Sequence, residues 1–117
     1  PAIVSHNAVP ILAVGASGGR RITNCVAQLV MHVVDYEMSA QAALDAPRVD
    51  ASTPWITLDG RFGEQIAEDL RARGWDVRLP PYPEQSAFAS PVAILRAADG
   101  SLRGGADTFH SAEARGW

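Results

Sequence analysis

The stretch Gly15-Ala16-Ser17-Gly18-Gly19 separates a strand-like segment of the chain from a helix-like one. Before it, β-branched and apolar residues alternate loosely over residues 1–14, with a turn signal at His6-Asn7, so a β-hairpin is predicted. After it, apolar residues recur at helical spacing from about Arg21 to Asp35, at Ile22, Cys25, Val26, Leu29, Val30, Val33 and Val34. The sequence therefore predicts a hairpin that leads into a glycine-rich turn, and a long helix that starts at this turn.

The rest of the chain carries shorter helix and strand signals. Ser39 is a suitable N-cap for a short helix from Ala40 to Asp45, which must end before Pro47. Further elements are predicted at residues 55–58 (strand), 64–73 (amphipathic helix), 75–79 (strand), and 91–97 with 101–105 (hairpin). On the second helix, Ile66, Ala67 and Leu70 are expected to face inward. This order predicts an α+β fold whose helices pack on one face of a layered sheet.

Composition and charge exclude several classes of function. The chain has 117 residues, 47% of them hydrophobic and 20% charged, which is typical of a globular domain. The formal net charge is -3, and all ten basic residues are arginines. This balance disfavours non-specific binding to nucleic acid or to anionic membranes. A nucleic-acid partner is therefore not expected. No apolar run approaches the ~20 residues that a membrane-spanning helix needs, so no membrane span is expected either.

The glycine-rich turn is the segment with the clearest chemical potential. Free backbone N–H groups at the start of a helix can bind an anion, or stabilise the oxyanion that develops in acyl transfer. The alternative is a plain tight turn, which the spacing alone favours, since the glycines match neither a P-loop nor a dinucleotide fingerprint. Arg20 and Arg21 place two cations at a helix N-terminus, where the helix dipole is unfavourable to them. They are therefore expected to have an anionic partner, an acidic side chain in preference to a ligand.

Cys25 and His32 are not expected to act as a nucleophile and its base. Seven residues on a helix separate them by roughly 10 Å along the axis, beyond hydrogen-bond reach. Cys25 is expected in the core and His32 at a partly exposed position. Because His6, His32 and His110 are scattered singly and there is only one cysteine, no metal site is expected.

Two carboxylate pairs could in principle act as general acid and base. They are Asp45 with Asp50, and Glu68 with Asp69. The second pair falls on the solvent face of the predicted amphipathic helix, so solvation is the favoured interpretation there.

Several motifs, in the same order along the chain, resemble the γ-glutamyltransferase family. Gly15-Ala16-Ser17-Gly18-Gly19-Arg20-Arg21-Ile22 is similar to the family's Gly-Ser-Pro-Gly-Gly-Ser-Arg-Ile, and Asp45-Ala46-Pro47-Arg48 to its Asp-Ala-Pro-Arg. The segment Arg71-Ala72-Arg73-Gly74-Trp75-Asp76-Val77 resembles its Leu-x-x-x-Gly-His-x-Val. Gly104-Gly105-Ala106-Asp107 and Gly116-Trp117 resemble its closing segments. The resemblance covers essentially the whole chain.

The resemblance implies an N-terminal-nucleophile hydrolase fold, an αββα sandwich, of which residues 1–117 would form one partial domain, the C-terminal part of the small subunit. It implies self-cleavage that makes a Thr the N-terminus of the small subunit. That Thr attacks γ-glutamyl amides such as glutathione, and the acyl group then passes to water or to an amine. The backbone N–H groups of Gly18 and Gly19 correspond to the oxyanion hole, and Ser17, Gly18 and Gly19 to substrate-binding positions. No cofactor is implied.

Departures from the family pattern shape the remaining expectations. The nucleophile Thr and a Ser-Ser pair that binds substrate are expected before Pro1, so the partners would be the large subunit and the N-terminal part of the small subunit. The chain alone is expected to be inactive.

Ala16, Arg20, Ala89 and Thr108-Phe109 differ from the usual residues, which leaves the preferred acyl group open. A non-catalytic scaffold module and a small-anion binder are the alternatives. Family members are commonly exported, which suggests a periplasmic or extracellular location.

Overall fold

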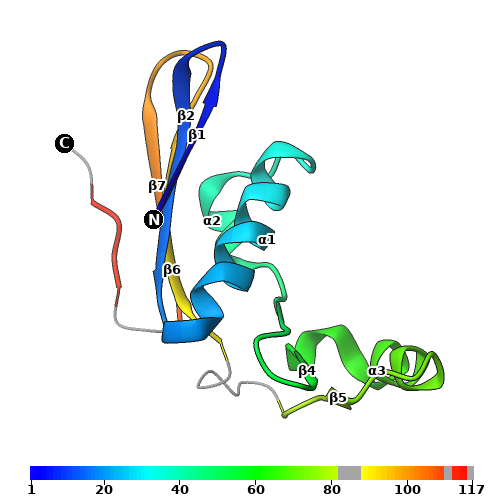
Figure 1. Cartoon of the computed structure of the whole chain (residues 1–117). Coiled ribbons are helices and arrows are strands. Elements are labelled where there is room, and N and C mark those ends of the chain that lie inside the picture. Colours follow the sequence, from blue (N-terminus) through cyan, green and yellow to red (C-terminus); the bar gives the residue numbers. More distant parts are fainter. Residues whose placement is uncertain (82–87, 110–111, 116–117) are drawn as a thin grey trace.

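The main unit of the computed structural model, which describes residues 1–81, 88–109 and 112–115, is a four-stranded antiparallel sheet. Its strands are β1 (Ala2–His6), β2 (Val9–Ser17), β6 (Ser90–Arg96) and β7 (Leu102–Ala106), in the order β1-β2-β6-β7. Helices α1 (Ile22–Val34) and α2 (Ala40–Asp45) cover one face of this sheet (Figure 1). Both predicted hairpins are confirmed.

The central strand β2 is the element that leads to the glycine turn. Leu12 and Val14 alternate with less buried neighbours and face the helices, as expected for a strand with one covered face. The strand pairs residue by residue with β6, from Leu12 opposite Leu95 to Ser17 opposite Ser90. The predicted turn at residues 15–19 is therefore shorter than expected, because Gly15, Ala16 and Ser17 continue β2 and the chain leaves the sheet at Gly18.

Helix α1 forms as predicted but buries a narrower stripe. Cys25, Leu29 and Val33 are buried at a spacing of four residues, whereas Val34 is 46% exposed. The prediction that Val34 faces the core is wrong, because a single sheet on one side of the helix covers only one row of side chains. The Ser39 side chain accepts a hydrogen bond of 3.2 Å from the Ala42 N–H and caps α2 as predicted.

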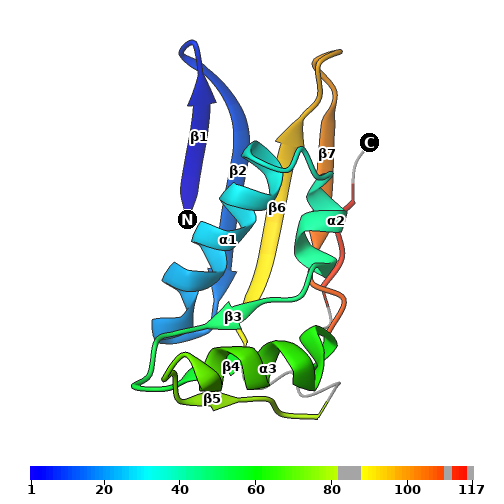
Figure 2. The same cartoon turned by 90° about the vertical axis from the view of Figure 1, so that its right-hand side faces the viewer.

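A second, smaller lobe was not predicted as a separate layer. Strands β3 (Val49–Asp50), β4 (Ile56–Leu58) and β5 (Val77–Arg78) form a three-stranded sheet, and α3 (Gly63–Ala72) packs beside it (Figure 2). Leu58, Ala67 and Val77 form its own core. Ile66 is 43% exposed, so its predicted inward position is wrong. The short strands leave no apolar surface to cover that part of α3.

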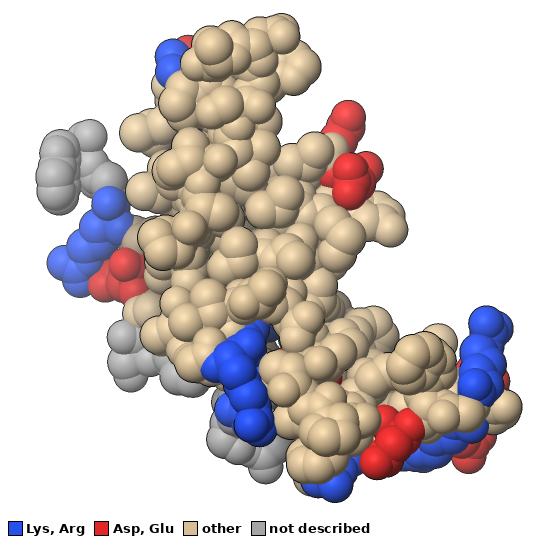
Figure 3. All heavy atoms as spheres, in the orientation of Figure 1, with Lys and Arg blue, Asp and Glu red and all other residues tan. Residues whose placement is uncertain are grey.

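Within the described residues, the face of the main sheet opposite the helices carries no helix and is only partly covered. Exposed apolar side chains on this side include Ile3, Val92, Ile94 and Leu102, which line a broad groove. Glu113, Ala114 and Arg115 also line this groove, and a Cβ on Gly104 would lie 2.9 Å from the Cβ of Ala114. Figure 1 shows α1 and α2 on the other side only, and charged side chains gather mainly around α3 in Figure 3. The described chain thus provides one helix layer and one sheet layer whose second face is partly covered by the C-terminal segment.

Candidate functional site

The glycine turn lies at an exposed edge, where β2 ends and α1 starts. Ser17, Gly18 and Gly19 are all exposed, and a single 3₁₀ turn, η1 (Gly19–Arg21), leads into α1. The Arg21 N–H donates to the Gly18 carbonyl at 3.3 Å. Within the described residues, the N–H groups of Gly18 and Gly19 take part in no turn or loop hydrogen bond. These two neighbouring amides lie at the positive end of the helix dipole.

The two glycines are needed for different physical reasons. A Cβ atom on Gly18 would lie 2.8 Å from the Cα and Cβ atoms of Ala89, so Gly18 allows the turn to touch the residue next to β6. Gly19 has a φ of 61°, a backbone conformation that side chains disfavour, and a Cβ there would meet no atom within 4 Å. The turn is therefore packed on the Gly18 side and open on the Gly19 side.

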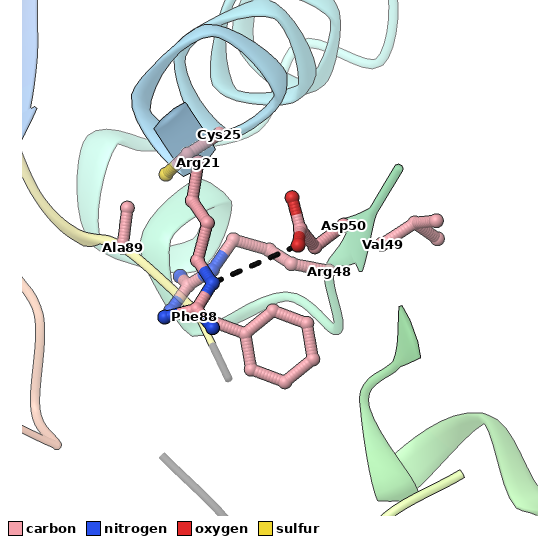
Figure 4. Close-up of a pocket in the computed structure, with 7 residues that line it drawn as sticks. All are labelled: Arg21, Cys25, Arg48, Val49, Asp50, Phe88 and Ala89. Carbon is pink, nitrogen blue, oxygen red and sulfur yellow. Dashed lines mark ion pairs between the residues drawn. The ribbon is translucent and has the colours of Figure 1, made fainter. Parts of the chain in front are cut away.

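The predicted acidic partner of the arginine pair is Asp50. Arg21 Nε lies 3.7 Å from Asp50 Oδ2, and the Asp50 side chain is nearly buried (Figure 4). The Ser52 N–H and hydroxyl donate to the same carboxylate at 3.2 and 3.0 Å. Arg20 is exposed, and the described ranges contain no ion pair for it. Asp50 therefore anchors the helix start, and we assign it no acid–base role.

The surroundings of the other acid–base candidates indicate a structural or a solvated role. Asp45 accepts a hydrogen bond of 3.0 Å from Gln41 within α2. Glu68 and Asp69 are exposed on α3, where Gln65 donates to Asp69 at 3.0 Å, in line with the solvated interpretation. Of these four carboxylates, Asp50 lies at the helix start, where it pairs with Arg21.

A buried ion pair joins two of the motifs noted above. Arg48 is 2% exposed and Asp107 is 1% exposed, and Arg48 Nη2 lies 3.7 Å from Asp107 Oδ1. Arg48 Nη1 donates to the Leu44 carbonyl at 2.6 Å, and the Asp107 N–H donates to the Pro91 carbonyl at 3.1 Å. This contact was not predicted. The signal in the sequence was that two family-like motifs, far apart in the chain, carry opposite charges.

Two glutamine side chains link the helices to strands, and neither link was predicted. Gln28 of α1 donates to the Val49 carbonyl at 2.7 Å and accepts from the Val49 N–H at 2.8 Å. Gln41 of α2 makes the same pair of bonds with Ala106, at 3.0 and 3.2 Å. Each side-chain amide thus makes the two backbone hydrogen bonds that a neighbouring strand would otherwise make, with Val49 of β3 or with Ala106 of β7.

Arg61 connects the smaller lobe to the end of α2. Its guanidinium pairs with Asp59 at 2.6 Å and donates to the Asp45 carbonyl. Burial raises the pKa of the Asp59 carboxyl, but the hydrogen bonds and charge of Arg61 outweigh it and hold that pKa below its usual value.

Cys25 and His32 occupy the predicted environments. Cys25 is a free, buried residue, and burial raises the pKa of its thiol. His32 is partly exposed, and its Nδ1 atom lies 3.3 Å from the Ala43 carbonyl oxygen. In the described part of the chain, no three His, Cys, Asp or Glu side chains are grouped so that they could hold a metal ion. His110 and the Gly116-Trp117 motif lie outside the described residues.

No helix among the residues placed by the structure has the length and apolar character needed to cross a bilayer.

Comparison with known proteins extends the resemblance to the whole chain. A γ-glutamyltranspeptidase family model matches residues 1–117. The glutathione hydrolase proenzyme of Escherichia coli K12 is 31% identical over 111 residues, which are 92% of this chain and 18% of that protein. The acylase ACY 1 proenzyme of Pseudomonas sp. strain V22 is 33% identical over 80% of this chain and 16% of its own length. The chain thus spans less than a fifth of these two relatives.

Solved structures show the same fold. A γ-glutamyltranspeptidase from Pseudomonas nitroreducens superposes with a TM-score of 0.82 over the whole chain and 61% of its own, at 21% identity. A cephalosporin acylase from Bacillus halodurans gives a TM-score of 0.80 at 29% identity, over 91% of this chain and 20% of its own. These neighbours have the N-terminal-nucleophile hydrolase fold, so the predicted α+β class and sandwich origin are confirmed. The chain belongs to the γ-glutamyltranspeptidase family.

Proposed function

We propose that this chain is the C-terminal part of the small subunit of an enzyme that transfers or hydrolyses γ-glutamyl groups, and that it supplies the oxyanion hole. In the proposed reaction, a Thr at a new chain end attacks a γ-glutamyl amide, such as that of glutathione. A tetrahedral intermediate forms and collapses to an acyl-enzyme, and the amine leaves. Water or a second amine then releases the acyl group.

The observation that carries the proposal is the pair of exposed amides at Gly18 and Gly19. An oxyanion hole needs donors that are fixed before the reaction and point to where negative charge develops. The turn is fixed by its contact with Ala89, and its Gly19 side is open for a reacting carbonyl. The start of α1 adds a favourable electrostatic field for the developing anion.

Ser17 is the proposed substrate-binding neighbour of these amides. It is exposed at the end of β2, one residue before Gly18. A hydroxyl at that position can donate to, or accept from, a polar group of the bound acyl donor. Together, Ser17, Gly18 and Gly19 would fix the carbonyl carbon relative to the attacking hydroxyl.

The remaining parts of the active site are proposed to come from the rest of the enzyme. Thr23, Thr53, Thr57 and Thr108 do not lie in a context that matches the family's nucleophile. The apolar face of the main sheet opposite the helices is only partly covered within the described residues, which suits the second sheet of an αββα sandwich. We therefore expect the isolated chain to show no turnover of a γ-glutamyl anilide. Turnover that is lost on mutation of a residue within the chain would contradict this.

The test of the oxyanion hole compares two glycines that share a backbone conformation. In the full-length enzyme, Gly19→Val places a branched side chain at the open side of the turn and should lower the acylation rate about 10²–10³-fold. Gly74→Val is the control, since Gly74 also has a positive φ (92°) and open surroundings but ends α3. Acylation is measured by the rapid release of nitroaniline from a γ-glutamyl p-nitroanilide.

The two variants separate strain from chemistry. Both should lower the free energy of unfolding by about 1–2 kcal/mol, because a residue with a side chain is strained in the left-handed backbone conformation. A urea titration would verify this loss. Only Gly19→Val should slow acylation. Equal acylation rates in the two variants would exclude Gly19 from the oxyanion hole.

A further inference from the structure

One peptide plane determines where the proposed oxyanion donor at Gly19 points. The Gly18 carbonyl and the Gly19 N–H belong to the same planar peptide unit, so the two groups point in opposite directions. The Gly18 carbonyl accepts a hydrogen bond of 3.3 Å from the N–H of Arg21. A contact that fixes Arg21 therefore also fixes the direction of the Gly19 N–H.

A buried carboxylate of the smaller lobe holds the side chain of Arg21. Arg21 Nε lies 3.7 Å from Asp50 Oδ2, and Asp50 is 3% exposed (Figure 4). Salt screens a partly buried pair of this kind much less than a pair on the surface. The carboxylate also offsets the repulsion between the arginine and the positive end of the α1 dipole. The ion pair thus favours one position of Arg21 in the turn.

Asp50 is fixed independently of Arg21. The N–H and the hydroxyl of Ser52 donate to its carboxylate at 3.2 and 3.0 Å. The residue before it, Val49, exchanges two hydrogen bonds with the Gln28 side chain, which ties β3 to α1. The carboxylate is therefore a fixed point relative to the helix, and the long arginine side chain is drawn to it.

We propose that Asp50 is a positioning residue for the oxyanion hole, which acts through Arg21 on the Gly19 amide. The carboxylate holds the Arg21 side chain, the Arg21 N–H holds the Gly18 carbonyl, and the peptide plane then directs the Gly19 N–H. Asp50 itself contacts no reacting atom and transfers no proton. The inference rests on the proposed function, because only a developing oxyanion gives the direction of this amide a kinetic effect.

The first test replaces Asp50 by asparagine in the full-length enzyme. Asparagine keeps an oxygen that can accept both bonds from Ser52, and it removes the charge that holds Arg21. We expect kcat and kcat/KM for a γ-glutamyl p-nitroanilide to fall together by about 10–10²-fold, because a displaced donor weakens binding of the transition state alone. A fall in kcat/KM that comes only from a raised KM would overturn the proposal.

The matched control is Asp59→Asn. It also removes the charge of a buried aspartate of the smaller lobe that pairs with an arginine, at 2.6 Å from Arg61. Arg61 donates to the Asp45 carbonyl at the end of α2 and not to the glycine turn. Asp59→Asn should therefore lower stability and leave kcat nearly unchanged. Equal values of kcat in Asp50→Asn and Asp59→Asn would overturn the positioning role.

A second variant approaches the ion pair from the other partner. Arg21→Gln removes the cation and leaves the bonds of Asp50 to Ser52 in place, so it should lower kcat as Asp50→Asn does. Because Asp50 is proposed to act through Arg21, the double variant should be no slower than the slower single variant. Effects that multiply in the double variant would overturn the route through Arg21. An unchanged kcat in Arg21→Gln would overturn it as well, even if Asp50→Asn did not fold.

Failure of this inference and failure of the proposed function give different results. If Gly19→Val slows acylation while Asp50→Asn acylates as fast as Asp59→Asn, the oxyanion hole stands and the positioning role is wrong. If Gly19→Val and Gly74→Val acylate equally fast, the proposed oxyanion hole is itself wrong, and the role of Asp50 with it. The inference predicts slow acylation in Gly19→Val and Asp50→Asn, and normal acylation in Gly74→Val and Asp59→Asn.

Discussion

The main sheet and the smaller lobe are stabilised in different ways. The main sheet has strands of five to nine residues and a contiguous apolar core that includes Leu12, Leu29 and Leu44. The smaller lobe has strands of two or three residues, and its buried core is Leu58, Ala67 and Val77. Ion pairs supplement it, at Asp59–Arg61 and, on the surface, at Glu64–Arg71.

This difference indicates which region fixes the glycine turn. The turn follows the central strand of the well-packed sheet and precedes the helix that covers it. Among the described residues, β3 of the smaller lobe contacts the start of α1 through the ion pair of Asp50 with Arg21. Under the proposed function, the oxyanion donors therefore lie on the better-packed region, and a polar contact from the other region supports them.

The largest effect should follow from breaking the buried ion pair. Arg48→Met leaves Asp107 charged and buried, so we expect a loss of about 3–5 kcal/mol in the free energy of unfolding, measured by urea titration. The control is Glu64→Gln, which removes the charge of an exposed pair with Arg71 and keeps the bonds of Arg71 to the Val77 carbonyl; it should cost about 0–1 kcal/mol. Similar losses in the two variants would show that the two regions do not differ as described.

The next effect concerns the glutamine that joins α1 to β3. Gln28→Leu removes both bonds to Val49 and leaves its N–H and carbonyl unsatisfied, which should cost about 1–3 kcal/mol. Gln65→Leu on the exposed face of α3 is the control, with an expected change within about 0.5 kcal/mol. Hydrogen exchange should show faster opening of β3 in the first variant only. Unchanged exchange at Val49 would argue that the link is not formed.

The smallest effect is a pH dependence specific to the smaller lobe. Because the folded protein holds the pKa of Asp59 below its unfolded value of about 3.9, the carboxylate contributes stability above that pH. This contribution is lost as the pH falls from about 5 through the lowered pKa. Asp59→Asn should therefore reduce the acid sensitivity of unfolding, measured as the change in urea midpoint between pH 6 and pH 3. An identical pH profile in the variant would refute this assignment.

Local periodicity predicted most elements of the fold, because the apolar spacing of α1 and the alternation in β2 reflect burial on one side. Two strands of the smaller sheet, β4 and β5, were predicted at residues 55–58 and 75–79, whereas β3 and the grouping of the three strands into a separate sheet were not. Strand β3 has two residues, too few for a periodic pattern, and β4 pairs in parallel with β5 across the intervening α3. Val34 and Ile66 were placed inward because their spacing fits a helix face, but spacing does not reveal how much surface the neighbouring layer covers.

The candidate site was predictable in part. The glycines and the demand of Arg21 for an acidic partner are local properties, and the sequence contains both. The Arg48–Asp107 pair and the contact of Gly18 with Ala89 depend on chain segments that meet only in the folded protein. Residue spacing alone favoured a plain turn, and the oxyanion role of Gly18 and Gly19 stays a proposal.

The central claim is that the Gly18 and Gly19 amides face a reacting carbonyl, and a crystal structure of the full-length enzyme with a tetrahedral γ-glutamyl analogue tests it most directly. The account predicts that the oxygen which mimics the oxyanion lies about 2.7–3.1 Å from both backbone nitrogens. It would be contradicted if that oxygen were bound by other donors while both amides remained in solvent.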